Sequence, residues 1–178
     1  ARFELVQKET HFASADLYGA FGAQFKFRDF AAIGDEAFTP PSTTRQLGLF
    51  TMQELRKGPL RLEAGGRFET TRHQSDAIGA ERNFNAVSVS AGVGFEPAEG
   101  WFMGVTGLRT ERAPSTEELF SDGPHLATAS YEIGDPTLGI ETARGVEGTV
   151  RYAADKWSFA VNGFYTSYRD FIFETETG

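Results

Sequence analysis

The sequence predicts an all-β protein, an antiparallel up-and-down meander of about eight strands that forms part of a transmembrane β-barrel. Apolar and polar residues alternate along most of the chain, which is the pattern of strands whose two faces meet different surroundings. Short connections alternate with long ones between these segments, and each tryptophan directly follows a short connection. Tight turns at one end, long loops at the other and aromatic girdles are typical of outer-membrane barrels.

The alternation is clearest in "PLRLEAGGRFET", where Leu62 and Phe68 share one face and Arg61 and Arg67 share the other. No helical period of 3.6 residues competes with it over a long window. The same pattern predicts strands at 1–9, 17–31, 44–55, 59–72, 84–97, 101–112, 139–153 and 157–175.

The connections are predicted to differ at the two ends of the sheet. Short turns are expected at 56–58, 98–100 and 154–156, with a somewhat longer one at 12–16, and long loops at 32–43, 74–82 and 113–138. Trp101 and Trp157 each follow a short turn. We therefore expect both at the same end of the sheet, where a girdle meets the membrane interface.

Composition excludes several classes of protein. The net charge of −8 argues against nucleic acid as a partner, and the absence of cysteine excludes a disulfide scaffold or a thiolate metal site. Residues 1–10 lack the apolar segment of a signal peptide, and no run approaches the ~18 apolar residues of a transmembrane helix. The motifs GxxxxGK[ST], HExxH and GxSxG are absent, and no nucleophile–base pair is evident, so we expect no enzyme.

One helix is predicted inside the longest loop. Ser115 and Glu118 have the spacing of a capping box directly after Pro114. Gly123 and Pro124 then break the chain, so we expect one or two turns of helix.

The loop at 113–138 is also the candidate substrate site. It carries several carboxylates and one histidine but no lysine or arginine, and this donor set suits a divalent cation such as zinc. We expect a mobile extracellular loop, with His125 as the metal contact. The candidate substrate-binding residues are Asp122, His125, Glu132, Asp135 and, on another loop from which it could face His125, His73. The simpler alternative is a solvated loop whose charges keep it soluble.

The segment "RAPSTEELF", followed by "YEIGDPTLGIE" and an alternating strand, resembles the middle-to-late barrel of TonB-dependent outer-membrane receptors. The matching residues are Arg112, Ala113, Pro114, Glu118, Leu119, Gly134, Pro136, Leu138 and Glu141. "DFIF", "AAIGDEAFTPP" and "FTMQEL" also resemble strands of that family, while Asp135 stands where the family more often has Asn. The resemblance covers nearly the whole chain, so we treat 1–178 as one partial barrel domain.

The resemblance implies a receptor in the bacterial outer membrane that takes up a metal or metal chelate with energy supplied by the TonB system. The candidate cargoes are zinc, haem and a ferric siderophore, with no resident cofactor. "GPHLAT…YEIGDP" is closer to zinc-uptake receptors, whereas Glu-Arg-Ala-Pro and Asp-Pro-Thr-Leu differ from the boxes of haem receptors. The family barrel has about 22 strands around a plug. Here we expect about eight strands, no plug and no TonB box, with lipid and a small-molecule or metal substrate as partners.

Two other functions stay open at this stage. One is a small self-contained eight-stranded outer-membrane barrel with a structural or adhesive role, since about eight strands can close a barrel. The other is a soluble β-barrel binding protein, in which the tryptophans would belong to an ordinary core.

Overall fold

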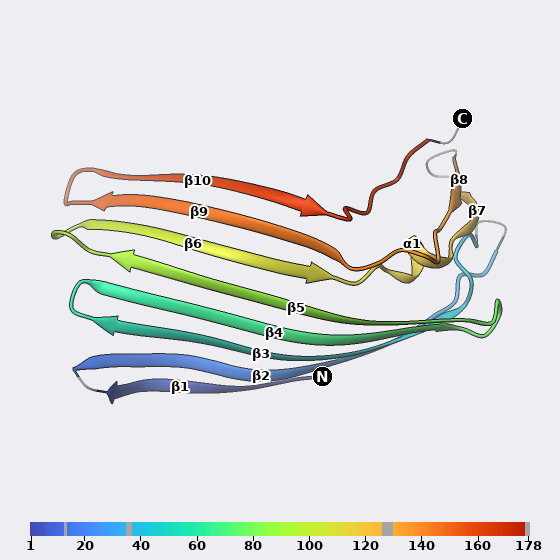
Figure 1. Ribbon diagram of the computed structural model, residues 1–178, viewed down its shortest axis with the longest axis horizontal. Coiled ribbons are helices and arrows are strands. Elements are labelled where there is room, and N and C mark those ends of the chain that lie inside the picture. Colours follow the sequence, from blue (N-terminus) through green and yellow to red (C-terminus); the bar gives the residue numbers. More distant parts are fainter. Residues whose placement is uncertain (13, 35–36, 126–129, 177–178) are drawn as a thin grey trace.

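A computed structural model describes residues 1–12, 14–34, 37–125 and 130–176. Its elements in chain order are β1 (Arg2–Phe12), β2 (Ala15–Phe30), β3 (Ser42–Lys57), β4 (Leu60–Ser75), β5 (Ala80–Phe95), β6 (Trp101–Arg112), α1 (Thr116–Phe120), β7 (Asp122–His125), β8 (Ser130–Ile133), β9 (Glu141–Ala153) and β10 (Ser158–Arg169) (Figure 1). No helix among the described residues combines the length and apolarity needed to cross a membrane as a helix.

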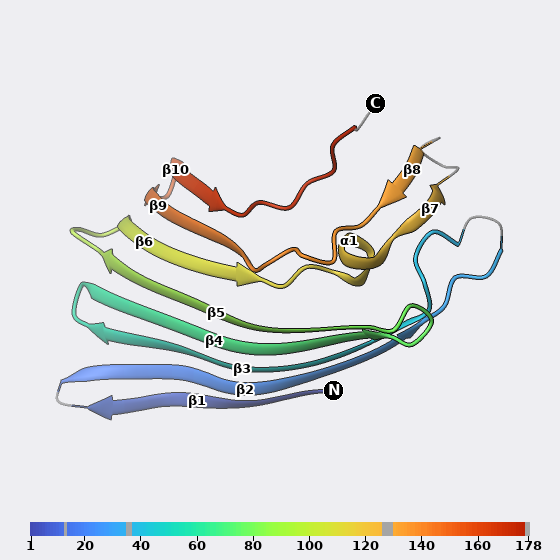
Figure 2. The ribbon, with the colours of Figure 1, turned by 45° about the vertical axis from the view of Figure 1, so that its right-hand side comes forward.

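The strands β1 to β6, β9 and β10 form one eight-stranded antiparallel sheet in chain order, and β7 and β8 form a separate two-stranded sheet. The predicted meander is therefore confirmed. Figure 2 shows the large sheet as a single curved layer, with α1, β7 and β8 gathered at one end. Within the described residues, the edge strand β1 pairs only with β2 and the edge strand β10 pairs only with β9. The two edge strands do not pair with each other, so the sheet is open.

The two faces of the sheet differ in chemistry. We call the face on which α1 packs the inner face and the opposite face the outer face. On the outer face, the register places Leu49 beside Phe68 and Phe68 beside Val87. On the inner face of β4, Arg67 instead pairs with Glu69. This is the result expected from period-two alternation, because successive side chains of a strand point to opposite faces.

The apolar outer face is exposed along the sheet. Half-exposed apolar side chains on this face include Phe25, Leu49, Phe68, Val89, Val105, Val146 and Val161. The buried apolar cluster of the described residues is small by comparison, and it consists of Phe84, Leu119 and Phe120 with four partly buried neighbours. A soluble barrel would bury one of its faces, so this distribution opposes the soluble alternative.

The tryptophan prediction is confirmed by the strand register. Trp101 pairs with Tyr152, and Trp157 directly precedes Ser158, whose partner is Ala153. Both tryptophans therefore lie at the short-turn end. The ring of Trp101 is 4.9 Å from that of Tyr152 and 5.8 Å from that of Phe159, measured between centroids, which makes an aromatic cluster at this end.

Two of the sequence-based boundaries are wrong. The connection predicted as a long loop at 74–82 is a tight turn at 76–79, because pairing of β4 with β5 continues as far as Ser75 and Ala80. The residues on either side of this turn are polar and resemble a loop in sequence, but they pair with one another as the last residues of β4 and the first residues of β5. The last strand ends at Arg169 and does not reach 175, and Asp170 follows with a φ of 54°.

Candidate substrate-facing segment

The residues between β6 and β9 form what we call the 113–140 segment, which contains α1 and the β7–β8 hairpin. The helix and hairpin lie together at one end of the sheet (Figure 2). As expected, the segment lies outside the eight-stranded sheet. Its helix nevertheless packs on that sheet, because Leu119 is 1% exposed and contacts Phe84 of β5 together with Phe120. Residues 126–129 of the predicted loop lie outside the described residues.

The predicted helix and its capping box are confirmed. The Ser115 hydroxyl accepts from the backbone N–H of Glu118 at 3.2 Å, and the Glu118 carboxylate accepts from the backbone N–H of Ser115 at 2.7 Å. Pro114 lacks an N–H and therefore ends strand pairing before the helix starts. The helix ends after one turn at Ser121, whose N–H donates to the carbonyl of Glu117 at 3.2 Å.

Arg112 joins three parts of the chain. Its guanidinium donates to both carboxylate oxygens of Glu118, at 3.1 and 2.9 Å, and to Glu141 at 3.1 Å. Glu141 is 8% exposed and also accepts from the backbone N–H of Ile172 at 3.0 Å. Charge-assisted bonds of this kind are among the stronger polar contacts. The end of β6, the start of α1 and the start of β9 are thereby tied together, as expected for an arginine paired with carboxylates.

His73 holds the segment to the sheet. It is 5% exposed, and its Nε2 lies 3.0 Å from the carbonyl oxygen of Pro114 while its Nδ1 lies 2.9 Å from the hydroxyl of Thr44. A carbonyl can only accept, so Nε2 carries the proton, and Nδ1 of the neutral ring accepts from Thr44. Both ring nitrogens are therefore engaged, and these contacts direct His73 to Pro114 and Thr44 and not to His125.

Gly134 makes a close backbone contact with the end of α1. Its N–H donates to the carbonyl of Ser121 at 2.7 Å, and the next N–H, of Asp135, donates to the carbonyl of Glu118 at 2.9 Å. A Cβ added at Gly134 would lie 2.7 Å from the carbonyl carbon of Leu119. Glycine is required here by the approach of two backbones and not by a left-handed conformation.

Asp135 stabilises the turn that follows. Its carboxylate accepts from the backbone N–H of Thr137 at 2.7 Å and from the Thr137 hydroxyl at 2.6 Å. These hydrogen bonds lower the pKa of the Asp135 carboxyl. Beyond the turn, Arg82 of β5 donates to the carbonyl of Leu138 at 2.9 Å. The described contacts of Asp135 thus shape the chain as it returns to β9.

Glu117 of α1 makes an ion pair that the sequence did not predict. Its carboxylate lies 2.8 Å from the guanidinium of Arg28 on β2. Burial raises the pKa of the Glu117 carboxyl, but hydrogen bonds from its own backbone, from Arg28 and from Thr116 outweigh that effect and hold the pKa below its usual value. The helix is therefore anchored to β2 as well as to β5.

His125 and Glu132 come together on the β7–β8 hairpin. The carboxylate of Glu132 accepts from Nδ1 of His125, and the two side chains are 31% and 20% exposed in the order His125, Glu132. The imidazole stacks on Phe38, with 4.7 Å between ring centroids and 26° between planes. A carboxylate behind one ring nitrogen is the usual second partner of a metal-binding histidine. No sequence pattern pointed to Phe38, which lies in the β2–β3 connection.

Asp122 lies at the other end of the same hairpin. Its carboxylate accepts from the hydroxyl of Tyr131 at 3.0 Å, and this hydrogen bond raises the pKa of Tyr131. The backbone N–H of Asp122 donates to the carbonyl of Phe38 at 2.7 Å. Three sequence candidates, Asp122, His125 and Glu132, therefore share one hairpin, whereas Asp135 and His73 lie among the contacts that hold the segment in place.

The fold agrees with comparison to known proteins. Residues 2–178 match the family described as TonB dependent receptor-like, beta-barrel. The chain therefore belongs to the β-barrel family of TonB-dependent receptors.

Among solved structures, the chain is similar to the hemophore receptor HasR of Serratia marcescens, which was solved as a double mutant in complex with its hemophore HasA and heme. The TM-score is 0.77 at 18% sequence identity, and the match covers 94% of this chain and 32% of HasR. The chain thus spans about a third of the length of HasR. At this identity the similarity shows the fold alone.

Proposed function

We propose that this chain forms part of the wall of an outer-membrane receptor that takes up a metal or metal chelate with energy from the TonB system. The family match over residues 2–178 is the observation that carries this proposal. The open sheet favours a receptor wall over a self-contained eight-stranded barrel, because β1 and β10 do not pair with each other within the described residues.

The outer face supports a membrane location. On β4 the apolar outer positions run from Leu60 to Phe68, and on β5 from Val87 to Phe95. At ~3.3 Å per residue and a tilt of roughly 40°, each run covers on the order of 20 Å along the membrane normal, close to the ~25 Å band of outer-membrane barrels. Beyond these runs, toward α1, the outer positions become polar, with Arg72 and Glu81 in an ion pair of 2.6 Å.

We assign the substrate contact to the β7–β8 hairpin. His125 offers an imidazole oriented by Glu132 and Phe38, and a histidine so supported suits zinc or the iron of haem. Asp122 adds a carboxylate to the same hairpin. The haem bound by HasR makes haem a cargo to test beside zinc, and a ferric siderophore held by other loops is the remaining candidate.

Titration of the intact receptor in detergent with zinc, and separately with haem, tests the assignment. His125→Ala should weaken binding of one cargo by ~10-fold or more, since a ligand or its support is lost. Ile133→Ala is the matched control, because it shortens a side chain of the same hairpin that is 74% exposed and is not among the proposed contacts. If His125→Ala leaves both affinities unchanged, the hairpin is not a metal or haem contact, and uptake of ferric siderophores should be measured instead.

Uptake assays test the energy requirement independently. Cells that express the intact receptor should accumulate the cargo only while the proton-motive force is maintained. Uptake that continues after an uncoupler collapses this force would contradict the proposal of TonB-driven transport, whatever the result for His125.

A further inference from the structure

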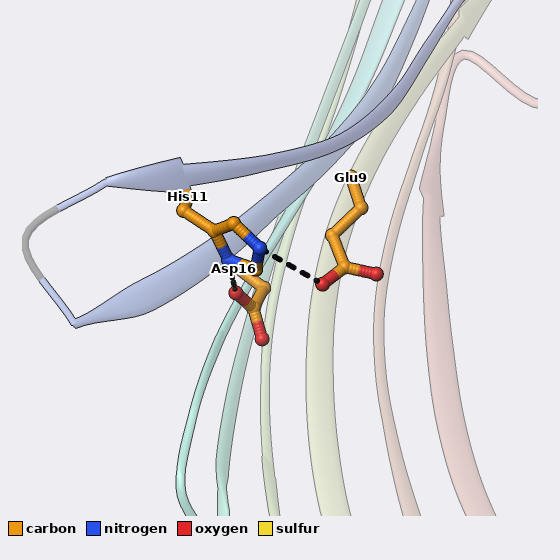
Figure 3. Close-up of side chains that lie close together, drawn as sticks. All are labelled: Glu9, His11 and Asp16. Carbon is orange, nitrogen blue, oxygen red and sulfur yellow. Dashed lines mark hydrogen bonds and ion pairs between the residues drawn. The ribbon is translucent and has the colours of Figure 1, made fainter.

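The short-turn end of the sheet holds a second group of possible metal ligands, far from the 113–140 segment. Glu9 and His11 on β1 and Asp16 on β2 each offer one ligand atom, and these atoms all lie within 4.8 Å of one another. Figure 3 shows the imidazole of His11 between the two carboxylates, beside the β1–β2 turn. In Figure 1 this turn and α1 lie at opposite ends of the sheet.

Strand pairing explains how the three residues meet. His11 is the direct partner of Asp16, and the register shifts between Gln7 and Thr10. Two residues of β1, one of them Glu9, therefore oppose a single residue of β2, which is the arrangement of a β-bulge. The bulge lies next to the turn and leaves Glu9 and His11 with their side chains on the same side of the strand.

The distances differ in a way that suits a metal ion. His11 Nδ1 lies 2.6 Å from Asp16 Oδ1, a normal charge-assisted hydrogen bond, whereas His11 Nε2 lies 3.7 Å from Glu9 Oε1, too far for one. Two zinc bonds of ~2.1 Å that meet at the tetrahedral angle of roughly 109° separate their ligand atoms by about 3.4 Å, a little less than the distance found here. An ion therefore fits between Nε2 and Glu9 with little movement of either side chain.

The charge balance also favours a cation. Among the described residues, the ion pairs of Glu9 and Asp16 are both with His11. The nearby guanidinium of Arg56 is engaged elsewhere, since it pairs with Glu54 and lies 4.8 Å from the ring centroid of Tyr18. Glu9 also has a hydrogen bond with the uncharged Tyr18 side chain. With a neutral imidazole, neither carboxylate is in an ion pair with a cationic side chain among the described residues.

We propose that His11 Nε2 and Glu9 bind a divalent transition-metal ion such as Zn²⁺, with Asp16 as the positioning residue and water completing the coordination. Asp16 accepts the proton of Nδ1, which fixes the tautomer that exposes the Nε2 lone pair to the ion. The side chains of Glu9, His11 and Asp16 are 48%, 81% and 39% exposed, so the ion exchanges readily with solvent. The bound ion joins the two sides of the bulge. The proposal is independent of the function proposed above.

Zinc titration of the intact receptor in detergent tests the proposal. His11→Gln and Glu9→Gln should each abolish one zinc-binding event, and Asp16→Asn should weaken the same event by ~10-fold or more. Glu99→Gln is the matched control, because Glu99 is an exposed carboxylate in the short β5–β6 turn at the same end of the sheet. The His125→Ala receptor should keep this event, which separates it from the substrate site.

Electron paramagnetic resonance of bound Cu²⁺ supplies a second measurement. In the His125→Ala receptor, which lacks the proposed substrate-site imidazole, coupling to an imidazole nitrogen should be present with His11 and also after Asp16→Asn, and it should be lost after His11→Gln. The proposal is overturned if His11→Gln and Glu9→Gln bind zinc as the parent does. The positioning role of Asp16 is overturned if Asp16→Asn binds with unchanged affinity.

Discussion

Replacing Gly134 by alanine tests whether close backbone packing holds the 113–140 segment on the sheet. The added Cβ would lie 2.7 Å from the carbonyl carbon of Leu119, 2.7 Å from the nitrogen of Phe120 and 2.8 Å from the nitrogen of Ser121. All three are backbone atoms at the end of α1 and cannot rotate away. Either the helix or the chain at Gly134 must therefore move.

The expected cost follows from these contacts. Overpacking costs ~1–3 kcal/mol, and the movement strains two backbone hydrogen bonds, Gly134 to Ser121 and Asp135 to Glu118, each worth ~1 kcal/mol. Alanine also lowers the conformational entropy of the undocked chain relative to glycine, and this offsets ~0.4–1 kcal/mol of the loss. The net loss is about 2–3 kcal/mol, which raises the undocked population roughly 30- to 150-fold.

Hydrogen–deuterium exchange of the receptor in detergent measures this population. Peptides that cover 116–125 and 130–141 should lose protection in Gly134→Ala, while peptides from β3 and β4 should not. Gly139→Ala is the control, because a Cβ at Gly139 has no atom within 4 Å, so it reports the effect on the undocked chain alone. Equal protection in Gly134→Ala and the parent, or equal losses in the two variants, would refute the packing argument.

Three further predictions use the same preparation. Leu119→Ala should lower the free energy of undocking by ~2–3 kcal/mol, because a buried side chain is lost. Ile133→Ala should leave exchange unchanged, because Ile133 is 74% exposed. The pKa of the Glu117 carboxyl is lowered in the docked segment, so the ionised carboxylate stabilises docking at pH values above the ordinary carboxyl pKa. This stabilisation is lost as the pH falls through the lowered pKa of the docked state. From about pH 6 to about pH 3, the parent should therefore lose more protection than Glu117→Gln, and equal losses would contradict this. On the outer face, Ala91→Lys, in the middle of the apolar run of β5, should impair assembly into lipid vesicles by ~2–4 kcal/mol, while Ser90→Lys on the inner face should assemble as the parent does.

The eight long strands could be predicted because one physical constraint acts along each of them. Every second residue meets a different environment, and this leaves a period-two pattern in the sequence itself. The β7–β8 hairpin left no such pattern, since β7 is the four-residue strand "DGPH". Pro124 within it cannot donate a ladder hydrogen bond, so the sequence pattern predicts a break in the chain there and not a strand.

The candidate site could be predicted only in part, because its contacts join distant residues. His125 and Glu132 were identified by residue type and charge, but Phe38, which stacks on His125, comes from a connection near the start of the chain. His73 is a substrate-binding candidate in the sequence by residue type and because it could face His125 from another loop. Its burial between Thr44 and Pro114 depends on where the 113–140 segment packs, which no local pattern encodes.

The residues of the family motif contact one another and fix the path of the chain, so the motif is evidence for the fold and not for the identity of the cargo. Arg112 bonds to Glu118 and Glu141, and Gly134 packs on the end of α1, so these residues fix the path of the chain from β6 to β9. His125 lies between these anchors in sequence, and it contacts Phe38 and Glu132, neither of which belongs to the motif. A substitution on the hairpin can thus change the groups offered to a cargo while the anchors keep their contacts. Under the function proposed above, the hairpin presents the groups that select the cargo, and the motif supplies the support from which the hairpin projects.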